Sequence, residues 1–329
     1  MVVGLSLACS DKPADKRPVA SATPTDSKIP ILFDTDANNE LDDQHAMAYL
    51  FFNDQHFDIV GVTVNATYNG GAIDEQVAEA ERVMKLCDVL EEIPLLKGSD
   101  ADFEDIVAEI DADTFDGAEA VSFIIEEANK PRKQKLVLMP VGKLTNVALA
   151  LKKSPEIADR VRIVWLGSNY PEPGEYNLEN DIPAMNYILN TVVPFEMVMV
   201  RYGKPSGSDA VRATPTDIYE KLKGKGPSIE MVVEGRHGGE FNIFGDYSVS
   251  LFEHADLHGD PPSRALFDMV AVAILKNETW GSKKTIAAPI MVDAKWVERP
   301  ENNRKIDIWE DFRSSEILED FYVTIAKAN

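Results

Sequence analysis

The sequence predicts an α/β protein with an open, mostly parallel central sheet flanked by helices. Short apolar runs of strand length recur along the 329 residues, and several of them end in polar or acidic residues. Segments with helical periodicity lie between these runs, an alternation that is typical of parallel sheets. Such sheets bind ligands at the carboxyl ends of their strands, so the polar residues there are the first candidates for a functional site.

The first predicted strand is the apolar run 31–33. It leads into Asp34 and Asp36, and Asp42 and Asp43 then open a segment with helical periodicity. Carboxylates gathered at a strand end would repel one another by roughly 4 kcal/mol per close pair at an effective dielectric near 20. A hard cation with oxygen ligands would relieve this repulsion, and we expect calcium rather than magnesium. The alternative is an acidic loop whose last two acids simply favour a helix start.

The second predicted strand, 57–64, ends in a polar loop that contains Asn65 and Asn69 beside a Gly-Gly pair. This composition is also typical of an ordinary turn. Further along, the pattern predicts a helix over 74–90, a short strand over 93–98, an acidic loop over 100–116 and a helix over 117–129.

Two more predicted strands, 135–140 and 161–166, also lead into polar segments. After the first comes a turn with Thr145, which would also serve as an ordinary helix cap. After the second comes a loop with Glu175 and Asn177, which would face a cleft at the strand ends or form an exposed turn. We expect the next helix to run from about 181 to 190.

The last third of the chain is predicted to contain a strand over 197–201 and a helix that begins near Phe267 and Asp268. The stretch 231–262 has little apolar periodicity, and we interpret it as a lid over the site. A strand over 288–292 and a helix from about 310 complete a single predicted domain, 28–329.

Composition excludes some classes of function. The 33 basic and 56 acidic residues give a net charge of −23, which disfavours binding of nucleic acid or of anionic membranes through the surface field. No apolar stretch is long enough to span a membrane. Two cysteines cannot form a disulfide framework, and Cys87 lies in an amphipathic helical pattern typical of a core thiol.

The N-terminus suggests a membrane anchor. Residues 5–9, Leu-Ser-Leu-Ala-Cys, resemble the end of a bacterial lipoprotein signal, and residues 10–27 have the composition of a disordered tether. We therefore expect lipidation at Cys9 and a location in the bacterial cell envelope, with no other membrane contact. The alternative is a disordered N-terminus in a cytoplasmic protein.

Four motifs, in order, resemble the inosine-uridine preferring nucleoside hydrolase family. The first acidic segment resembles the family pattern DxDxGxDDxxA, with a loop 37–41 that is two residues longer. The turn after 135–140 resembles GPLTNxA with Lys143 in place of proline. The segment 175–177 resembles EFN, and 267–273 resembles HDPLAVA with Phe267 in place of histidine.

This resemblance implies a calcium-dependent hydrolase that releases base and ribose from a small-molecule nucleoside or related N-riboside, in a homodimer or homotetramer. By resemblance Asp36 is the catalytic base. The implied calcium ligands are Asp36, Asp43, the carbonyl of Thr145, and Asp268. The implied substrate-binding residues are Asp42, either Asn65 or Asn69, Glu175, Asn177 and Phe267, which would stack on the aglycone.

Phe267 replaces the family's leaving-group acid. Another residue must therefore protonate the base, or the substrate must carry a good leaving group; the candidates for this acid are His237, His254, His258 and Tyr247. Two other functions stay open: a ribose-binding protein without turnover, and a phosphohydrolase of the haloacid-dehalogenase type. The latter needs Thr or Val two residues after Asp36, where this chain has Asn38.

Overall fold

The computed structural model describes residue 1 and residues 28–328. Its centre is an eight-stranded sheet with the order β11-β14-β6-β5-β4-β1-β2-β3. All neighbouring strands are parallel except β11, which pairs antiparallel with β14 at one edge. The predicted fold class, an open and mostly parallel sheet flanked by helices, is confirmed. The sheet strands are β1 Ile29–Thr35, β2 Phe57–Val64, β3 Leu95–Lys97, β4 Leu136–Pro140, β5 Val161–Leu166, β6 Phe195–Val198, β11 Ser282–Ala287 and β14 Lys305–Glu310.

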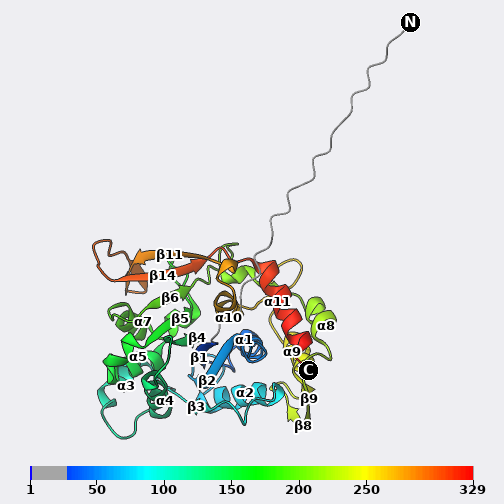
Figure 1. Ribbon diagram of the computed structural model, residues 1–329, viewed down its shortest axis with the longest axis horizontal. Coiled ribbons are helices and arrows are strands. Elements are labelled where there is room, and N and C mark those ends of the chain that lie inside the picture. Colours follow the sequence, from blue (N-terminus) through cyan, green and yellow to red (C-terminus); the bar gives the residue numbers. More distant parts are fainter. Residues whose placement is uncertain (2–27, 329) are drawn as a thin grey trace.

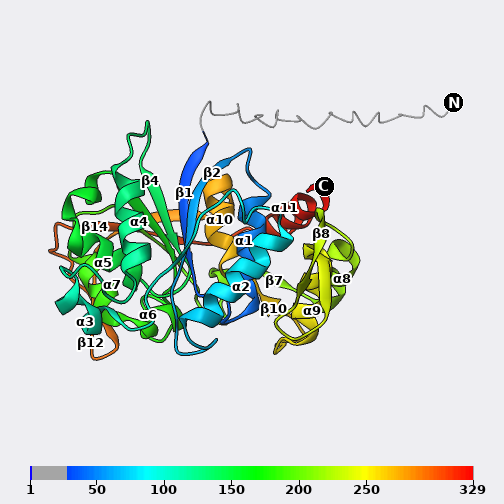
Figure 2. The same ribbon diagram turned by 90° about the horizontal axis from the view of Figure 1, so that it is seen from below.

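Helices cover both faces of the sheet, as Figures 1 and 2 show. Side chains alternate along β1, so that Ile31 and Phe33 pack into one core while Leu32 packs into the other. The first core is closed by α1, α2, α10 and α11, and the second by α3, α4, α5 and α7. Their bounds are α1 Leu41–Phe51, α2 Ile73–Leu86, α3 Phe103–Ile106, α4 Ala118–Asn129, α5 Thr145–Lys153, α7 Ile182–Leu189, α10 Met269–Lys276 and α11 Ser314–Lys327.

Helix α1 is buried along its whole length. It packs beside α2 and α10 and also contacts α9 and α11, so even its polar residues are out of water. This position explains why two acidic residues in its first turn, Asp42 and Asp43, are buried.

A smaller unit follows the sixth strand and lies beside α1 and α2 in Figure 2. It contains β7 Arg212–Ala213, α8 Pro215–Leu222, β8 Ser228–Glu234, β9 Glu240–Ile243, α9 Phe244–Glu253 and β10 Arg264–Ala265. The expectation of an irregular lid over 231–262 is therefore wrong for most of that stretch. Its hairpin and helix escaped prediction because most residues of β8 are exposed, which leaves no continuous apolar pattern.

Other boundaries differ more modestly. The predicted acidic loop 100–116 contains α3 and a 3₁₀ turn, Val107–Glu109, and the helix expected to reach residue 90 ends at Leu86. The strand β14 was not predicted, and the segment 288–292 contains only β12, Ile290–Val292, which pairs with β13, Lys295–Val297, outside the main sheet. Cys87 is buried with a free thiol, as predicted. Among the described residues no helix has the length and apolarity needed to cross a membrane; Cys9 lies outside them.

Candidate functional site

A cavity of about 270 Å³ opens where the carboxyl ends of β1, β4, β5 and β6 meet. Seven of the residues predicted from sequence line it: Asp36, Asp42, Asp43, Glu175, Asn177, Phe267 and Asp268. They come from segments far apart in the chain, and the parallel sheet brings them together because each follows a strand or begins a helix at the same edge.

Three of these carboxylates converge. Single oxygen atoms of Asp42, Asp43 and Asp268 all lie within 4.8 Å of one another, and all three side chains are buried. Asp42 and Asp43 occupy the first turn of α1, while Asp268 immediately precedes α10, so two packed helices deliver them. We call this group the acidic trio.

The trio is costly to ionise as it stands. Burial, with a smaller contribution from the nearby charge of Asp36, raises the pKa of Asp42 to about 7. Burial, followed by the charges of neighbouring acids, raises the pKa of Asp43 and Asp268 well above the ordinary range. The hydroxyl of Thr35 donates a hydrogen bond to Asp43, which stabilises its charged form only in part.

Asp34 and Asp36 lie on either side of Thr35 at the end of the first strand and have different environments. Asp34 does not line the cavity and accepts hydrogen bonds from Thr63 at 2.6 Å, Asn65 at 2.5 Å and Asn146 at 2.8 Å. Burial nevertheless raises its pKa to about 6. Asp36 faces the cavity and accepts one side-chain hydrogen bond, from the hydroxyl of Thr67 at 2.6 Å. Burial raises its pKa to about 7, which suits a general base near neutral pH.

The turn after β4 approaches these residues very closely. A Cβ atom on Gly142 would lie 2.6 Å from Asp36 Oδ1 and 2.8 Å from Asn65 Oδ1, so a larger residue there would displace these two side chains. Val141, one residue earlier, lines the cavity, and its carbonyl accepts a hydrogen bond from Asn177 Nδ2 at 2.6 Å. A second bond from the same amide reaches Leu166 O at 3.1 Å. These two bonds fix the Asn177 amide, with Nδ2 bound to backbone carbonyls.

Glu175 caps the short helix α6, Tyr176–Asn180. Its carboxylate accepts backbone hydrogen bonds from Ser168 at 2.8 Å, Asn177 at 3.1 Å and Leu178 at 2.9 Å. Burial raises its pKa to about 7 despite these donors. Ser168, which donates one of the bonds, has a left-handed φ of 77°, an uncommon conformation for a residue other than glycine.

An aromatic pair forms another part of the wall. Phe267 and Tyr202 meet edge to face, with ring centroids 5.9 Å apart and an interplanar angle of 89°. Tyr202 follows Arg201, whose φ of 48° is also left-handed and whose guanidinium forms an ion pair with the buried Glu310. The backbone N–H of Tyr202 donates to Asn169 Oδ1 at 3.1 Å. This strained, well-anchored segment was not identified as functional from sequence, because it matches no motif.

Three predicted site residues do not line the cavity. Asn69 is exposed, and Asn65 is buried behind Gly142, where its Oδ1 has no hydrogen-bond partner among the described residues. Thr145 begins α5, and its hydroxyl donates to Asp181, on the side away from the cavity. From this turn Val141, rather than Thr145, lines the cavity.

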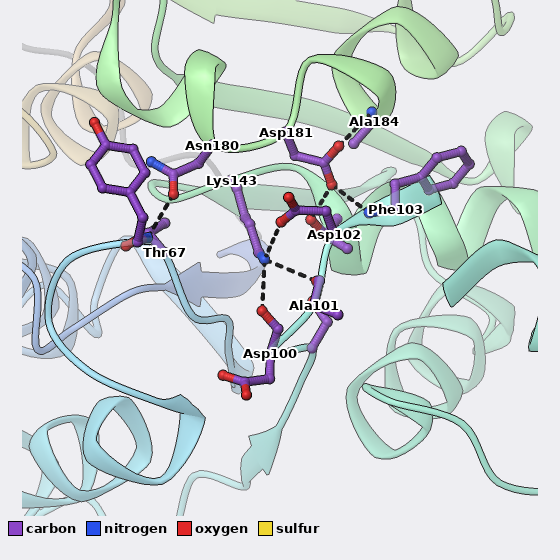
Figure 3. A network of polar contacts seen from close by, with 12 residues as sticks. Thr67, Asp100, Ala101, Asp102, Phe103, Lys143, Asn180, Asp181 and Ala184 are labelled. Carbon is purple, nitrogen blue, oxygen red and sulfur yellow. Dashed lines mark hydrogen bonds and ion pairs between the residues drawn. The ribbon is translucent and has the colours of Figure 1, made fainter. Parts of the chain in front are cut away.

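Lys143, which stands where the resembled motif has proline, is almost fully buried in this turn. Figure 3 shows its ammonium between the carbonyls of Asp100 and Ala101 and the carboxylate of Asp102, at 3.0, 2.9 and 2.8 Å. All three protons of the ammonium therefore have acceptors, and the lysine ties the turn after β4 to the loop before α3.

Of the four candidates for the leaving-group acid, only His258 lines the cavity. His237 and His254 stack on each other with ring centroids 4.5 Å apart beside a neighbouring cavity. Tyr247 is buried and donates to Glu79 Oε1 at 2.5 Å. The cavity is also lined by residues that were not selected as site residues from the sequence: Asn39, Glu40, Val141, Leu166, Tyr176, Val200, Tyr202, Asp209, Arg212, Arg264 and Ala265.

Comparison with known proteins identifies relatives. The sequence model of the family described as inosine-uridine preferring nucleoside hydrolase matches residues 31–315. An enzyme of that name from Leishmania major is 30% identical over 112 residues, which are 31% of this chain and 36% of the relative. One from Crithidia fasciculata is 33% identical over 81 residues, 23% of this chain and 26% of the relative. The chain thus aligns with only about a third of these relatives' length or less.

Similarity to solved structures extends over nearly the whole chain. A plant nucleoside hydrolase has a TM-score of 0.69 at 16% identity, covering 92% of this chain and 100% of the other. A purine-preferring ribonucleoside hydrolase from Gardnerella vaginalis has a TM-score of 0.64 at 19% identity, covering 90% and 98%. At this level of identity the likeness shows a common fold.

Proposed function

The chain belongs to the inosine-uridine preferring nucleoside hydrolase family, and from this premise we propose that it hydrolyses the N-glycosidic bond of ribonucleosides or related N-ribosides. The observation that carries the proposal is the meeting of Asp36, the acidic trio and the pair Glu175 and Asn177 in one cavity. A general base, a cation site and hydrogen-bonding groups for a sugar are what such a hydrolysis requires.

The acidic trio fits a hard cation, and we propose calcium. Three buried carboxylates whose charges oppose one another, together with a backbone carbonyl at Val141, offer only oxygen donors. We propose the Val141 carbonyl as a calcium ligand in place of the Thr145 carbonyl. Asp36 remains a proposed ligand at the edge of the calcium site. When bound, calcium would neutralise the trio and lower the pKa of a water molecule.

Asp36 then acts as the general base. It takes a proton from the attacking water, whose oxygen forms the new bond to the anomeric carbon as the bond to the aglycone breaks. The hydroxyl of Thr67 holds the carboxylate in place through a hydrogen bond of 2.6 Å. The pKa of Asp36, raised to about 7 by burial, keeps it basic enough to accept the proton.

The sugar hydroxyls would be held by carboxylates and an amide at the cavity wall. Asp42 and Asn177 bind the 2′ and 3′ hydroxyls, and Glu175 binds the 5′ hydroxyl. The three backbone donors that fix Glu175 support this assignment, since they orient its carboxylate before substrate arrives. Neither Asn65 nor Asn69 lines the cavity: Asn65 donates to Asp34 at 2.5 Å behind Gly142, and Asn69 is exposed, so we assign the sugar contacts to the other residues.

On the aglycone side, Phe267 and Tyr202 supply an apolar wall, and His258 is the proposed acid that protonates the leaving nitrogen. General acid catalysis contributes about 10²–10⁴-fold to rate. Because Phe267 replaces the family's histidine, a second function is also proposed: a protein that binds calcium and ribose without hydrolysing a riboside.

The experiment is a panel of purine, pyrimidine and nitrophenyl ribosides, assayed for release of reducing sugar with calcium and with chelator. Calcium-dependent release that Asp36→Asn abolishes is the expected result. His258→Gln should slow purine ribosides by about 10²–10⁴-fold and nitrophenyl ribosides far less, since nitrophenolate needs no acid. Calcium binding without release from any riboside would instead favour the binding protein.

We also propose that the protein is anchored to the bacterial envelope through Cys9 and that it forms a homodimer or homotetramer. The Leu-Ala-Cys sequence and the tether-like composition of 10–27 support the anchor. Detergent-phase partition that Cys9→Ser abolishes, and mass measurement by light scattering, would test the two statements.

A further inference from the structure

A second cavity, of about 190 Å³, adjoins the first and shares Asn39, Glu40 and Arg264 with it. The other walls of this second cavity include Arg236 and His237 from the turn between β8 and β9, and His254 at the end of α9. The two cavities are thus neighbouring chambers with a shared wall, and the second lies toward the small unit that Figure 2 shows beside α1 and α2.

The shared wall is made by the loop 37–41, the segment that is two residues longer than the family pattern. Asn38 fixes this loop: its N–H donates to Gln76 Oε1 at 2.6 Å, and its amide donates to Gly70 O at 2.6 Å. Arg236 donates to the carbonyl of Asn38 at 2.8 Å and so joins the loop to the small unit. The added residues therefore form an ordered partition between the cavities.

The partition carries an ion pair whose acidic partner could be replaced by a ligand. Glu40 and Arg264 form an ion pair in which the Glu40 side chain is 41% exposed and the Arg264 side chain 14% exposed. Glu40 can therefore move into water, whereas Arg264 stays in the wall. Arg264 lies three residues before Phe267, on the same segment as the proposed aglycone contact.

Two arginines and two histidines line the second cavity, together with the acids Glu40 and Asp256. Arg236 is half-buried, and no carboxylate among residues 28–328 forms an ion pair with its guanidinium. Its side-chain hydrogen bond goes to a neutral carbonyl. His237 and His254 stack beside it with an interplanar angle of 15°. Two guanidinium groups that face one small cavity match a planar anion such as a carboxylate.

We propose that this second cavity binds an anionic group, of the carboxylate class, at the far end of the substrate's aglycone. In this proposal the Glu40 side chain moves into water and so opens the boundary between the two cavities. The ligand carboxylate then takes the place of Glu40 on Arg264 and also contacts Arg236. The substrates favoured by this chain are then N-ribosides or related ribosides with an acidic aglycone. The inference rests on the proposed riboside hydrolysis and assigns its substrate class.

The test compares a charged and a neutral substrate of nearly the same shape, 4-carboxyphenyl and 4-carbamoylphenyl β-ribofuranoside. We expect wild-type kcat/KM to favour the carboxylate, Arg236→Gln to lower this preference about tenfold, and Glu40→Gln to raise it. Each preference is a ratio within one variant, so any effect of a substitution on the acidic trio cancels. Arg313→Gln removes the same charge from a side chain that is 59% exposed and lies outside both cavities, and should leave the ratio unchanged.

The same ratio of the two rates in the wild type and in Arg236→Gln, or equal changes in Arg236→Gln and Arg313→Gln, would overturn the proposal. Hydrolysis of inosine is measured in parallel, because it reports on the proposed function alone. If no riboside is hydrolysed, calorimetric binding of the same two compounds still decides the question. A carboxylate preference that Arg236→Gln removes supports the second cavity as an anion subsite, and its absence refutes it.

Discussion

Asp34 and the acidic trio are buried at the same edge of the sheet, yet the protein treats their charges differently. Asp34 accepts hydrogen bonds from three neutral side chains. The members of the trio face one another across the cavity, within 4.8 Å. Fixed donors can stabilise a buried carboxylate, whereas mutual repulsion calls for a cation from outside. The comparison separates an acid that builds the site from acids that bind a ligand.

The largest expected effect is that of Asp43→Asn, which removes one charge from the trio. We expect kcat/KM to fall about 10³-fold or more, because the loss of a metal ligand removes several kcal/mol of transition-state stabilisation. In chelator the same variant should unfold at a higher temperature than wild type, since the repulsion is smaller. The exposed acid Asp54 supplies the matched control, and Asp54→Asn should change neither quantity. A chelated Asp43→Asn protein less stable than wild type would contradict this account of the trio.

Asp34→Asn should lower the stability of the protein and affect calcium affinity much less than Asp43→Asn does. An amide in place of the carboxylate turns a donor toward side chains that are themselves donors, at a cost of about 2–3 kcal/mol in the free energy of unfolding. Calcium affinity, measured by calorimetry on the folded fraction, should change far less than in Asp43→Asn. Similar losses of calcium affinity in the two variants would erase the distinction between the two sets of acids.

Calcium and pH together sharpen the comparison. Burial raises the pKa of Asp36 and Asp42 to about 7 in the folded protein, against about 4 in an unfolded chain. Without calcium, the folded state therefore keeps protons that the unfolded state has lost, and these groups lower stability as pH rises from about 4 to 7. The proposed calcium ion would bind the ionised carboxylates, so the increase in Tm on adding calcium should grow between about pH 5 and 8. A pH-independent increase would show that these acids do not ionise on binding.

The smallest effect concerns Asp36, which has one side-chain donor and is intermediate between the two environments. Thr67→Val removes that donor, whose hydrogen bond lowers the pKa of Asp36. The pKa of the base should therefore rise, so activity is lost at a higher pH as the solution is acidified. At high pH the rate should fall less than about tenfold, the value of one ordinary hydrogen bond. The pH dependence of kcat/KM distinguishes this from a general loss of packing, which would lower the rate without moving the acid limb.

Much of the fold was predictable because the strands of a parallel sheet are buried on both faces and appear as short apolar runs. The second and fifth strands begin and end at the predicted residues, 57–64 and 161–166. The hairpin of β8 and β9 was not, because its residues are mostly exposed and its position depends on contacts with α2. Exposed strands held by distant partners leave no apolar periodicity in their own sequence.

The residues of the site also divide into those that could be predicted from the sequence and those that could not. Acids that follow a strand or begin a helix, such as Asp36 and Asp268, could be selected from their position in the pattern. Tyr202 could not, because its place depends on the left-handed Arg201 and on a distant ion pair with Glu310. Thr145 was selected through its motif, but the direction of the chain at that turn presents Val141 to the cavity. A motif specifies neighbours in sequence, and the backbone decides which of them faces the ligand.

Gly142 limits which substitutions this protein can tolerate near its site. It carries no reactive group, yet even a methyl group there would collide with Asp36 and Asn65. In a saturation library this position should tolerate few substitutions, because Asp36 is the proposed base and Asn65 donates a hydrogen bond to Asp34. Variation that alters substrate choice is therefore confined to the outer walls, such as the extended loop 37–41, where residues can be inserted without disturbing the catalytic centre.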